Sequence, residues 1–119
     1  MIRNLLAKSA IISLAILLSA TVAVAHARLD NASPAVGSTV GSSPGQVTLH
    51  FTEGLEPKFS GAQIHNQAGA RVDTGSSVSG STMHVGVKSL GAGAYTVEWH
   101  ALSVDTHKTQ GSFTFHVGK

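Results

Sequence analysis

Cysteine is absent from the 119-residue chain, and methionine is scarce. Without thiolates the protein has no soft ligand for Cu(I), zinc or an iron–sulfur cluster, and it cannot close a disulfide. Of its two methionines, Met1 lies in the first 25 residues and only Met83 follows them. The sequence therefore nearly excludes a sulfur-rich metal site.

Charge is also scarce, since Asp, Glu, Lys and Arg make up 12% of the chain. Arg3 and Lys8 lie in the first 25 residues, and the other 94 residues carry six basic and six acidic side chains. Such a balanced chain, with no Lys/Arg cluster, argues against nucleic-acid binding and against a polybasic membrane surface.

The first 25 residues have the three-part form of a secretory signal. A short basic start precedes an apolar run from Ala10 to Val24, and Ala23-Val24-Ala25 is a small-x-small cleavage pattern. The run is shorter than the ~20 apolar residues that a spanning helix prefers. We therefore expect residues 1–25 to be cleaved, leaving residues 26–119 as one periplasmic domain without a membrane anchor.

Alternation of apolar and polar residues predicts strands along the mature chain. The clearest are 46–51, 83–87, 95–100 and 112–117, with weaker ones at 28–32, 59–65 and within 71–81. A polar connection at 103–111 is expected to join the last two strands. The pattern predicts an all-β fold, a small Greek-key β-sandwich or barrel of about seven strands, immunoglobulin-like or cupredoxin-like. Its centre is expected to hold Trp99, Phe51, Phe113 and Phe115.

Seven histidines suggest metal binding, but five of them have ordinary structural interpretations. Four alternate with apolar residues and should face outward, and the fifth precedes a turn: His50, His84, His100, His116 and His65. His26 is different, because it becomes the first residue after cleavage. Its α-amine and its Nδ1 atom could then close a six-membered chelate ring on one metal ion.

His107 is the second candidate ligand, two residues after Asp105 in a loop. Loops held by a rigid sandwich often carry binding groups. An isolated Asp-x-His is nevertheless more often an ordinary turn, in which the aspartate caps its own loop. Spacing alone therefore leaves both interpretations open.

A set of motifs that is specific only in combination extends over most of the mature chain. They are His26-Ala27-Arg28-Leu29, Ser33-Pro34-Ala35-Val36-Gly37-Ser38, Leu49-His50-Phe51-Thr52-Glu53, Phe59-Ser60-Gly61-Ala62, the segment from Gly93 to His107, and Gly111-Ser112-Phe113. With these motifs the chain resembles the CopC family, periplasmic copper-binding proteins linked to copper tolerance and delivery.

The resemblance implies a seven-stranded Greek-key fold and a high-affinity Cu(II) site that takes one copper ion per mature chain. Carried over to this sequence, its ligands are His26, Asp105 and His107, with Glu53 as a further oxygen in some members. Some members also have a Cu(I) site in a Met-rich stretch after Phe-Ser-Gly-Ala. Residues 63–69 contain no methionine, so the resemblance implies a Cu(II)-only type.

These groups suit Cu(II), which prefers a tetragonal array of nitrogen and oxygen donors. The amine and Nδ1 of His26 and one nitrogen of His107 supply three donors. Asp105 could supply the fourth or bind a water, and Glu53 could be an axial or outer oxygen. One extra residue before His26 would convert the amine to an amide and remove the chelate.

Three functions compete at this point. The favoured one is a non-enzymatic, monomeric carrier or buffer of Cu(II) in copper resistance and homeostasis, with a CopD-type inner-membrane transporter as a partner. The second is a small copper monooxygenase with an N-terminal histidine brace. The third is a metal-free structural β-sandwich module.

Overall fold

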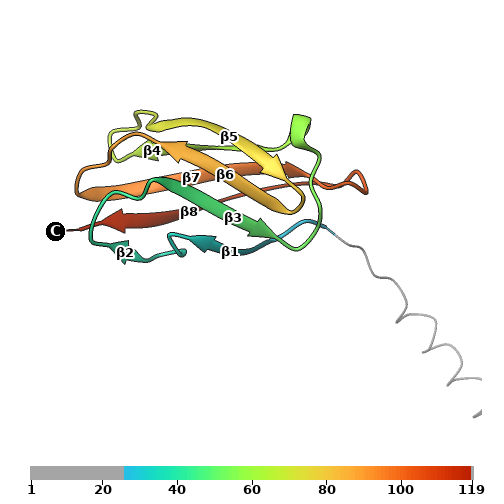
Figure 1. Ribbon diagram of the computed structural model, residues 1–119, viewed down its shortest axis with the longest axis horizontal. Coiled ribbons are helices and arrows are strands. Elements are labelled where there is room, and N and C mark those ends of the chain that lie inside the picture. The colour runs from blue at the N-terminus through green and yellow to red at the C-terminus, as the bar shows by residue number, and fades with distance from the viewer. Residues whose placement is uncertain (1–25, 119) are drawn as a thin grey trace, which may run out of the picture.

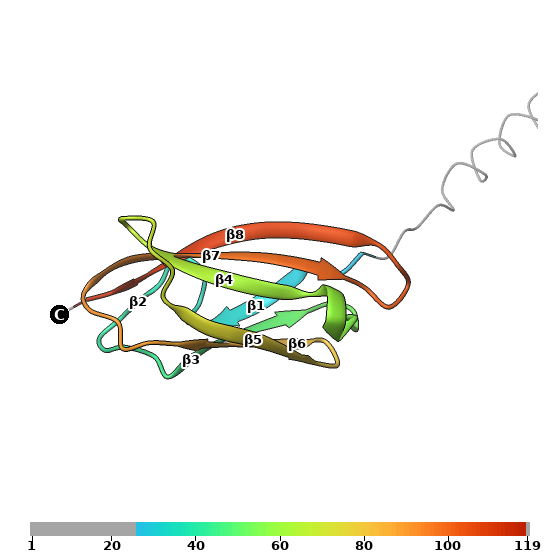
Figure 2. The same ribbon diagram turned by 90° about the horizontal axis from the view of Figure 1, so that it is seen from above.

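Apolar alternation builds two four-stranded sheets that pack face to face (Figures 1 and 2). The computed structural model describes residues 26–118, so the predicted signal segment 1–25 lies outside the described residues. The strands are β1 (Leu29–Ser33), β2 (Thr39–Val40), β3 (Gln46–Phe51), β4 (Gly61–Asn66), β5 (Asp73–Ser79), β6 (Thr82–Val87), β7 (Gly93–Leu102) and β8 (Lys108–Val117), and η1 (Pro57–Phe59) is a 3-10 helix.

The sheets have the strand orders β1-β3-β6-β5 and β2-β8-β7-β4. All neighbouring strands pair antiparallel except β2, whose two residues run parallel to the end of β8. The all-β sandwich prediction is thus confirmed, with eight strands in residues 26–118 where about seven were expected. In this part of the chain no helix is long and apolar enough to span a membrane.

The core lies between the sheets, where the inward residues of each strand meet. In β3, for example, Val47, Leu49 and Phe51 are buried while Thr48 and His50 are only partly covered. The largest fully buried side chains are Phe115, Leu49, Ile64, Met83, Val47, Val85 and Val97. Burial of these inward rows provides most of the stability of such a sandwich.

The sequence predicted Trp99 in the centre of the core, and this prediction was wrong. It is partly buried and packs edge-on against Phe51, with ring centroids 5.0 Å apart and an interplanar angle of 74°. Trp99 pairs with Gly111 of β8, so the indole covers a residue without a side chain. The tryptophan therefore closes the margin of the core.

The β7–β8 hairpin is longer than its sequence suggested. Its register runs from Gly93 opposite Val117 to Leu102 opposite Lys108, which reduces the connection to residues 103–107. The prediction of a polar connection over 103–111 was wrong in its extent. The start of β8 has no apolar alternation because Lys108 and Gln110 face solvent and Gly111 lies under Trp99.

Candidate metal centre

Residues 103–107 form a tight turn at the tip of the β7–β8 hairpin (Figure 1). The Ser103 N–H donates to the His107 carbonyl at 2.9 Å, and the Thr106 N–H donates to the Ser103 carbonyl at 2.8 Å. Thr106 has a φ of +73°, a left-handed conformation that L-residues rarely adopt. The turn therefore folds Asp105 and His107 back toward each other.

Ser103 holds this turn from below. Its side chain is fully buried; the hydroxyl donates to the Asp105 carboxylate and accepts from the His107 N–H at 3.2 Å. The hydrogen bond from Ser103, with a smaller contribution from His107, keeps the pKa of the Asp105 carboxyl below its ordinary value. Asp105 is therefore a carboxylate at neutral pH.

Asp105 in turn orients the ring of His107. The Nδ1 atom of His107 lies 3.2 Å from Oδ1 of Asp105, and both side chains are about two-fifths exposed (43% and 41%). A carboxylate at Nδ1 fixes the proton on that nitrogen, which leaves the lone pair of Nε2 available to a metal ion. The Nε2 atom of His107 can thus act as a metal ligand.

The start of the described chain is fastened beside this turn by two threonines. Thr109, at the start of β8, donates its hydroxyl proton to the carbonyl of the fully buried Ala27 at 2.9 Å. Thr52, just after β3, donates to the His26 carbonyl at 3.2 Å and accepts from the Arg28 N–H at 3.0 Å. Residues 26–28 are therefore attached to both sheets.

These attachments bring together two histidines that are 81 positions apart in the sequence. The rings of His26 and His107 have centroids 4.7 Å apart and an interplanar angle of 80°. Both views of the fold show the start of the described chain and the 103–107 turn at the same end of the sandwich (Figures 1 and 2). Two imidazoles and one carboxylate thus form a continuous set of contacts.

Glu53 is the exception among the predicted site residues. It is half-buried after β3, and within residues 26–118 it makes no hydrogen bond or ion pair with His26, Asp105 or His107. In the same range no three His, Asp or Glu side chains converge on one point as a ready-made metal site. In the full-length chain the nitrogen of His26 is also a peptide nitrogen, so a further donor arises only on cleavage.

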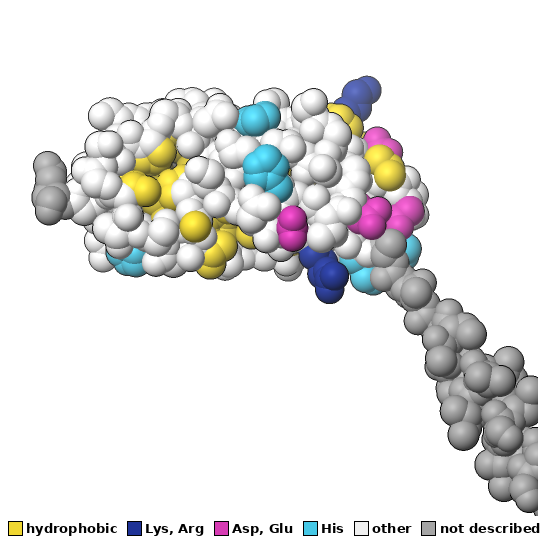
Figure 3. All heavy atoms as spheres, turned by 60° about the horizontal axis from the view of Figure 1, so that its bottom comes forward, with side chains coloured by type: hydrophobic (Ala, Val, Ile, Leu, Met, Phe, Trp, Pro, Cys, Tyr) yellow, Lys and Arg dark blue, Asp and Glu magenta, His cyan; other side chains and the backbone are white. Residues whose placement is uncertain are grey.

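The remaining histidines have the surroundings that alternation predicted. The Nδ1 atom of His50 lies 3.4 Å from the Thr82 hydroxyl, and that of His84 lies 3.0 Å from the Gln46 amide. Figure 3 shows histidines on the long face of the molecule, and histidine beside acidic side chains at the end where the described chain begins. None of these rings joins the contacts of His26 and His107.

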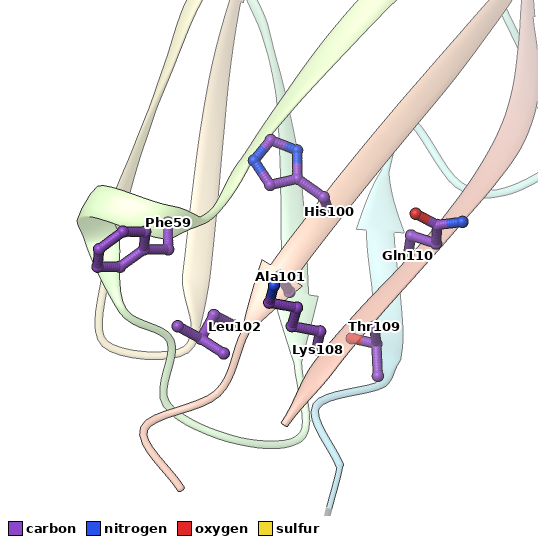
Figure 4. A pocket seen from close by; sticks show the side chains of 7 residues that line it. All are labelled: Phe59, His100, Ala101, Leu102, Lys108, Thr109 and Gln110. Atoms are coloured by element: carbon purple, nitrogen blue, oxygen red, sulfur yellow. The ribbon is translucent and has the colours of Figure 1, made fainter. Parts of the chain in front are cut away.

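A groove of about 390 Å³ lies on the outer face of the β7–β8 hairpin (Figure 4). It is lined by Phe59, His100, Ala101, Leu102, Lys108, Thr109 and Gln110. With one imidazole and no carboxylate on its walls, the groove lacks the donors of a copper site. The groove is therefore a poorer candidate for a metal centre than the tip of the hairpin.

Comparison with known proteins assigns the chain to a family. The family model for the CopC domain matches residues 29–118. The chain belongs to the CopC family. It is 39% identical over 98 residues to Protein YobA of Escherichia coli K12, with 78% of this chain and 79% of YobA covered. It is also 36% identical over 111 residues to Copper resistance protein C of Pseudomonas syringae pv. tomato, with 85% and 87% covered.

Solved structures share the fold. CopC from Methylosinus trichosporium OB3b has a TM-score of 0.74 and 31% identity, covering 78% of this chain and 94% of its own. PcoC, a methionine-rich copper resistance protein from Escherichia coli, has a TM-score of 0.69 and 32% identity, covering 78% and 99%.

Membership of the CopC family also identifies the type of function. Proteins of this family bind copper and are not enzymes, which confirms the prediction of a non-enzymatic copper-binding protein. The comparisons give no support to the monooxygenase or the metal-free alternative. The family match begins at Leu29 and does not include His26, so the ligands have to be argued from the geometry of this chain.

Proposed function

We propose that the mature chain is a periplasmic carrier or buffer that binds one Cu(II) ion through its N-terminal histidine and the Asp105–His107 turn. The proposal rests on one observation above all, the 4.7 Å separation of the His26 and His107 rings. The His26 ring is exposed and the His107 ring is partly exposed, so each has room to turn one nitrogen toward a shared ion. Cleavage after Ala25 adds the α-amine as a third nitrogen.

The resulting donor set suits Cu(II). The amine and Nδ1 of His26 form the chelate, and Nε2 of His107 adds a nitrogen from the opposite side. Asp105 acts by holding Nδ1 of His107, and such outer carboxylates make an imidazole a better donor. A water molecule completes a tetragonal array, Asp105 acts from outside it, and Glu53 remains a candidate for an outer oxygen.

We further propose that the protein is of the Cu(II)-only type. Met83 is the single methionine beyond residue 25, and its side chain is fully buried in the core. Residues 63–69, on β4 and the turn after it, carry no sulfur. This composition differs from that of PcoC, which is described as methionine-rich. The chain therefore lacks the thioether ligands that Cu(I) prefers.

A CopD-type membrane transporter is the proposed partner of the monomeric chain. The Copper transport protein CutJ of Bacillus subtilis is 34% identical over 100 residues, which cover 80% of this chain but 18% of CutJ. In that relative a domain like this one is a small part of a larger copper transport protein. The partial exposure of His107 and Asp105 also leaves the proposed site open to an incoming ligand.

The test uses protein secreted and processed by a bacterial host. Its mass is expected to be that of residues 26–119, plus one copper ion after addition of Cu(II). Affinity is then measured by competition with a chelator of known strength. His26→Ala and His107→Ala should each weaken binding by at least about 10-fold, the lower bound for loss of an outer-shell partner.

His116→Ala and His84→Ala are matched controls, because both remove an imidazole from an outer face of the sandwich. They should bind copper as the wild type does. Equal losses in all four variants, or no loss in any of them, would contradict the proposed site.

A further inference from the structure

The segment that carries His26 has no strand partner of its own. The regular pairing of β1 with β3 begins at Leu29, three residues after His26. Upstream of that point, residues 26–28 are held by a backbone hydrogen bond from Thr52 to Arg28 and by two threonine side chains. The position of His26 is therefore set by these hydrogen bonds together with the packing of the buried Ala27 side chain in the core.

Thr109 makes the longest-range of them, across 82 positions of sequence. Thr109 stands two residues after His107 in the extended start of β8, and its hydroxyl binds the carbonyl of Ala27, the neighbour of His26. One hydrogen bond thus links the residue next to the first proposed ligand with the strand that begins directly after the second.

We propose that Thr109 and Thr52 are positioning residues for copper binding, which set the distance between His26 and His107. The inference rests on the proposed function, because it concerns that same site. Neither hydroxyl is offered as a ligand; each holds a backbone carbonyl of the segment that carries His26. The bonds involve carbonyl groups and not the α-amine, so cleavage after Ala25 removes none of their donors or acceptors.

The physical reason lies in the two kinds of ring that the metal closes. The amine and Nδ1 of His26 belong to one residue, so their chelate needs no help from the fold. The bond to His107 closes a loop through most of the domain, and its strength depends on how well the two residues are held together beforehand. Loss of either threonine hydrogen bond lets residues 26–28 move, and copper binding must then order them at a cost in conformational entropy.

A purely structural role for Thr109 makes a different prediction. If the hydroxyl only stabilised the domain, its removal would leave the copper affinity of the folded protein unchanged, or would lower it by the same factor whether or not His107 is present. If it sets the spacing of the two ligands, its effect must vanish once His107 is gone. A double-mutant cycle between Thr109 and His107 separates the two roles.

The experiment measures Cu(II) dissociation constants by chelator competition on the secreted, processed protein. Thr109→Val removes the hydroxyl at nearly constant shape, and Thr109→Ser keeps it. Thr114→Val is the matched control, because Thr114 is also half-buried on β8 and its hydroxyl has no hydrogen-bond partner among the described residues. Each is compared in the wild-type and His107→Ala backgrounds.

We expect Thr109→Val to weaken binding about 3- to 10-fold, the size of one lost hydrogen bond, with Thr109→Ser and Thr114→Val close to the wild type. In the His107→Ala background the loss should be less than about twofold, the usual limit of additivity. Thr52→Val should behave like Thr109→Val, and it carries the test if Thr109→Val does not fold.

Two results would overturn the inference while leaving the proposed function intact. One is wild-type affinity in both Thr109→Val and Thr52→Val, and the other is an undiminished loss from Thr109→Val in the His107→Ala background. A wild-type protein whose copper affinity ignores His26→Ala and His107→Ala would instead overturn the proposed function, and this inference with it.

Discussion

The Trp99 indole packs directly over Gly111 in the β7–β8 hairpin, and this contact gives a sharp test of how the scaffold is built. A Cβ atom placed on Gly111 would lie 2.6 Å from Cζ2 and 2.9 Å from Cε2 of the Trp99 indole. Ordinary carbon–carbon contacts need about 3.5–4.0 Å. The indole also packs against Phe51. Gly111→Ala must therefore displace the ring by roughly 1 Å.

The cost of that displacement can be estimated. Overpacking a well-packed position typically costs about 1–3 kcal/mol, and each kcal/mol lowers the Tm of a domain of this size by about 4–8 °C. We expect Gly111→Ala to lower the Tm by roughly 10 °C. The hairpin carries the 103–107 turn at its tip, so copper affinity should fall together with stability.

Thermal unfolding followed by circular dichroism measures this effect. Gly45→Ala is the control, because a Cβ atom on Gly45 would meet no atom within 4 Å. Trp99→Phe shortens the ring that causes the clash, so Gly111→Ala should cost much less in that background. An unchanged Tm in Gly111→Ala, or the same loss with and without Trp99, would refute the reasoning.

Three further predictions concern protonation. Ser103→Ala should raise the pKa of Asp105 toward its ordinary value and weaken copper binding, as measured by a carboxyl-detected NMR titration and chelator competition; an unmoved pKa would contradict the role of Ser103. Burial raises the pKa of Asp73, but hydrogen bonds from Arg71 and the Ile64 N–H outweigh it and lower the pKa. Its contribution to stability is therefore present above the ordinary carboxyl pKa of about 3.9 and is lost as the pH falls through the lower folded value. Urea unfolding of Arg71→Ala should accordingly show a deficit at pH 7 that shrinks toward pH 2, and a constant deficit would contradict it. Copper affinity should fall as the pH drops below about 8, where the α-amine takes up a proton, and a flat profile between pH 8 and pH 6 would contradict the amine ligand.

Much of the fold could be predicted from alternation, because strands with one buried face record that burial in every second residue. Val47, Leu49 and Phe51 in β3 are the clearest case. The same rule failed at the start of β8, where the inward position is Gly111 and its space is filled by an indole from the neighbouring strand. The alternation of apolar side chains cannot reveal an inward position that is occupied by glycine and covered by a side chain of the neighbouring strand.

The site was predictable only in part. The importance of His26 followed from the cleavage pattern, and Asp105 and His107 came from the family resemblance, because Asp-x-His alone is a weak motif. Sequence reasoning missed Ser103, Thr52 and Thr109, which hold the turn and the terminal segment. The role of Thr109 could have been predicted only if β8 had been predicted to begin at Lys108, because that strand places Thr109 beside the segment that carries His26.

Glu53 illustrates the opposite limit. The resemblance includes it among the ligands, but among residues 26–118 it makes no hydrogen bond or ion pair with the two histidines or Asp105. Position after a strand end does not determine the direction of a side chain. Its role therefore remains a prediction, and Glu53→Gln measured by chelator competition would decide whether its charge contributes to copper affinity.

The central claim is that a free α-amine on His26 completes a copper site at the tip of the β7–β8 hairpin. The most direct measurement compares the Cu(II) affinity of the processed protein with that of the same protein carrying one additional alanine before His26. We predict a loss of at least about 10-fold, because a directly bound donor should matter no less than an outer-shell partner. Equal affinity in the two proteins would contradict the account.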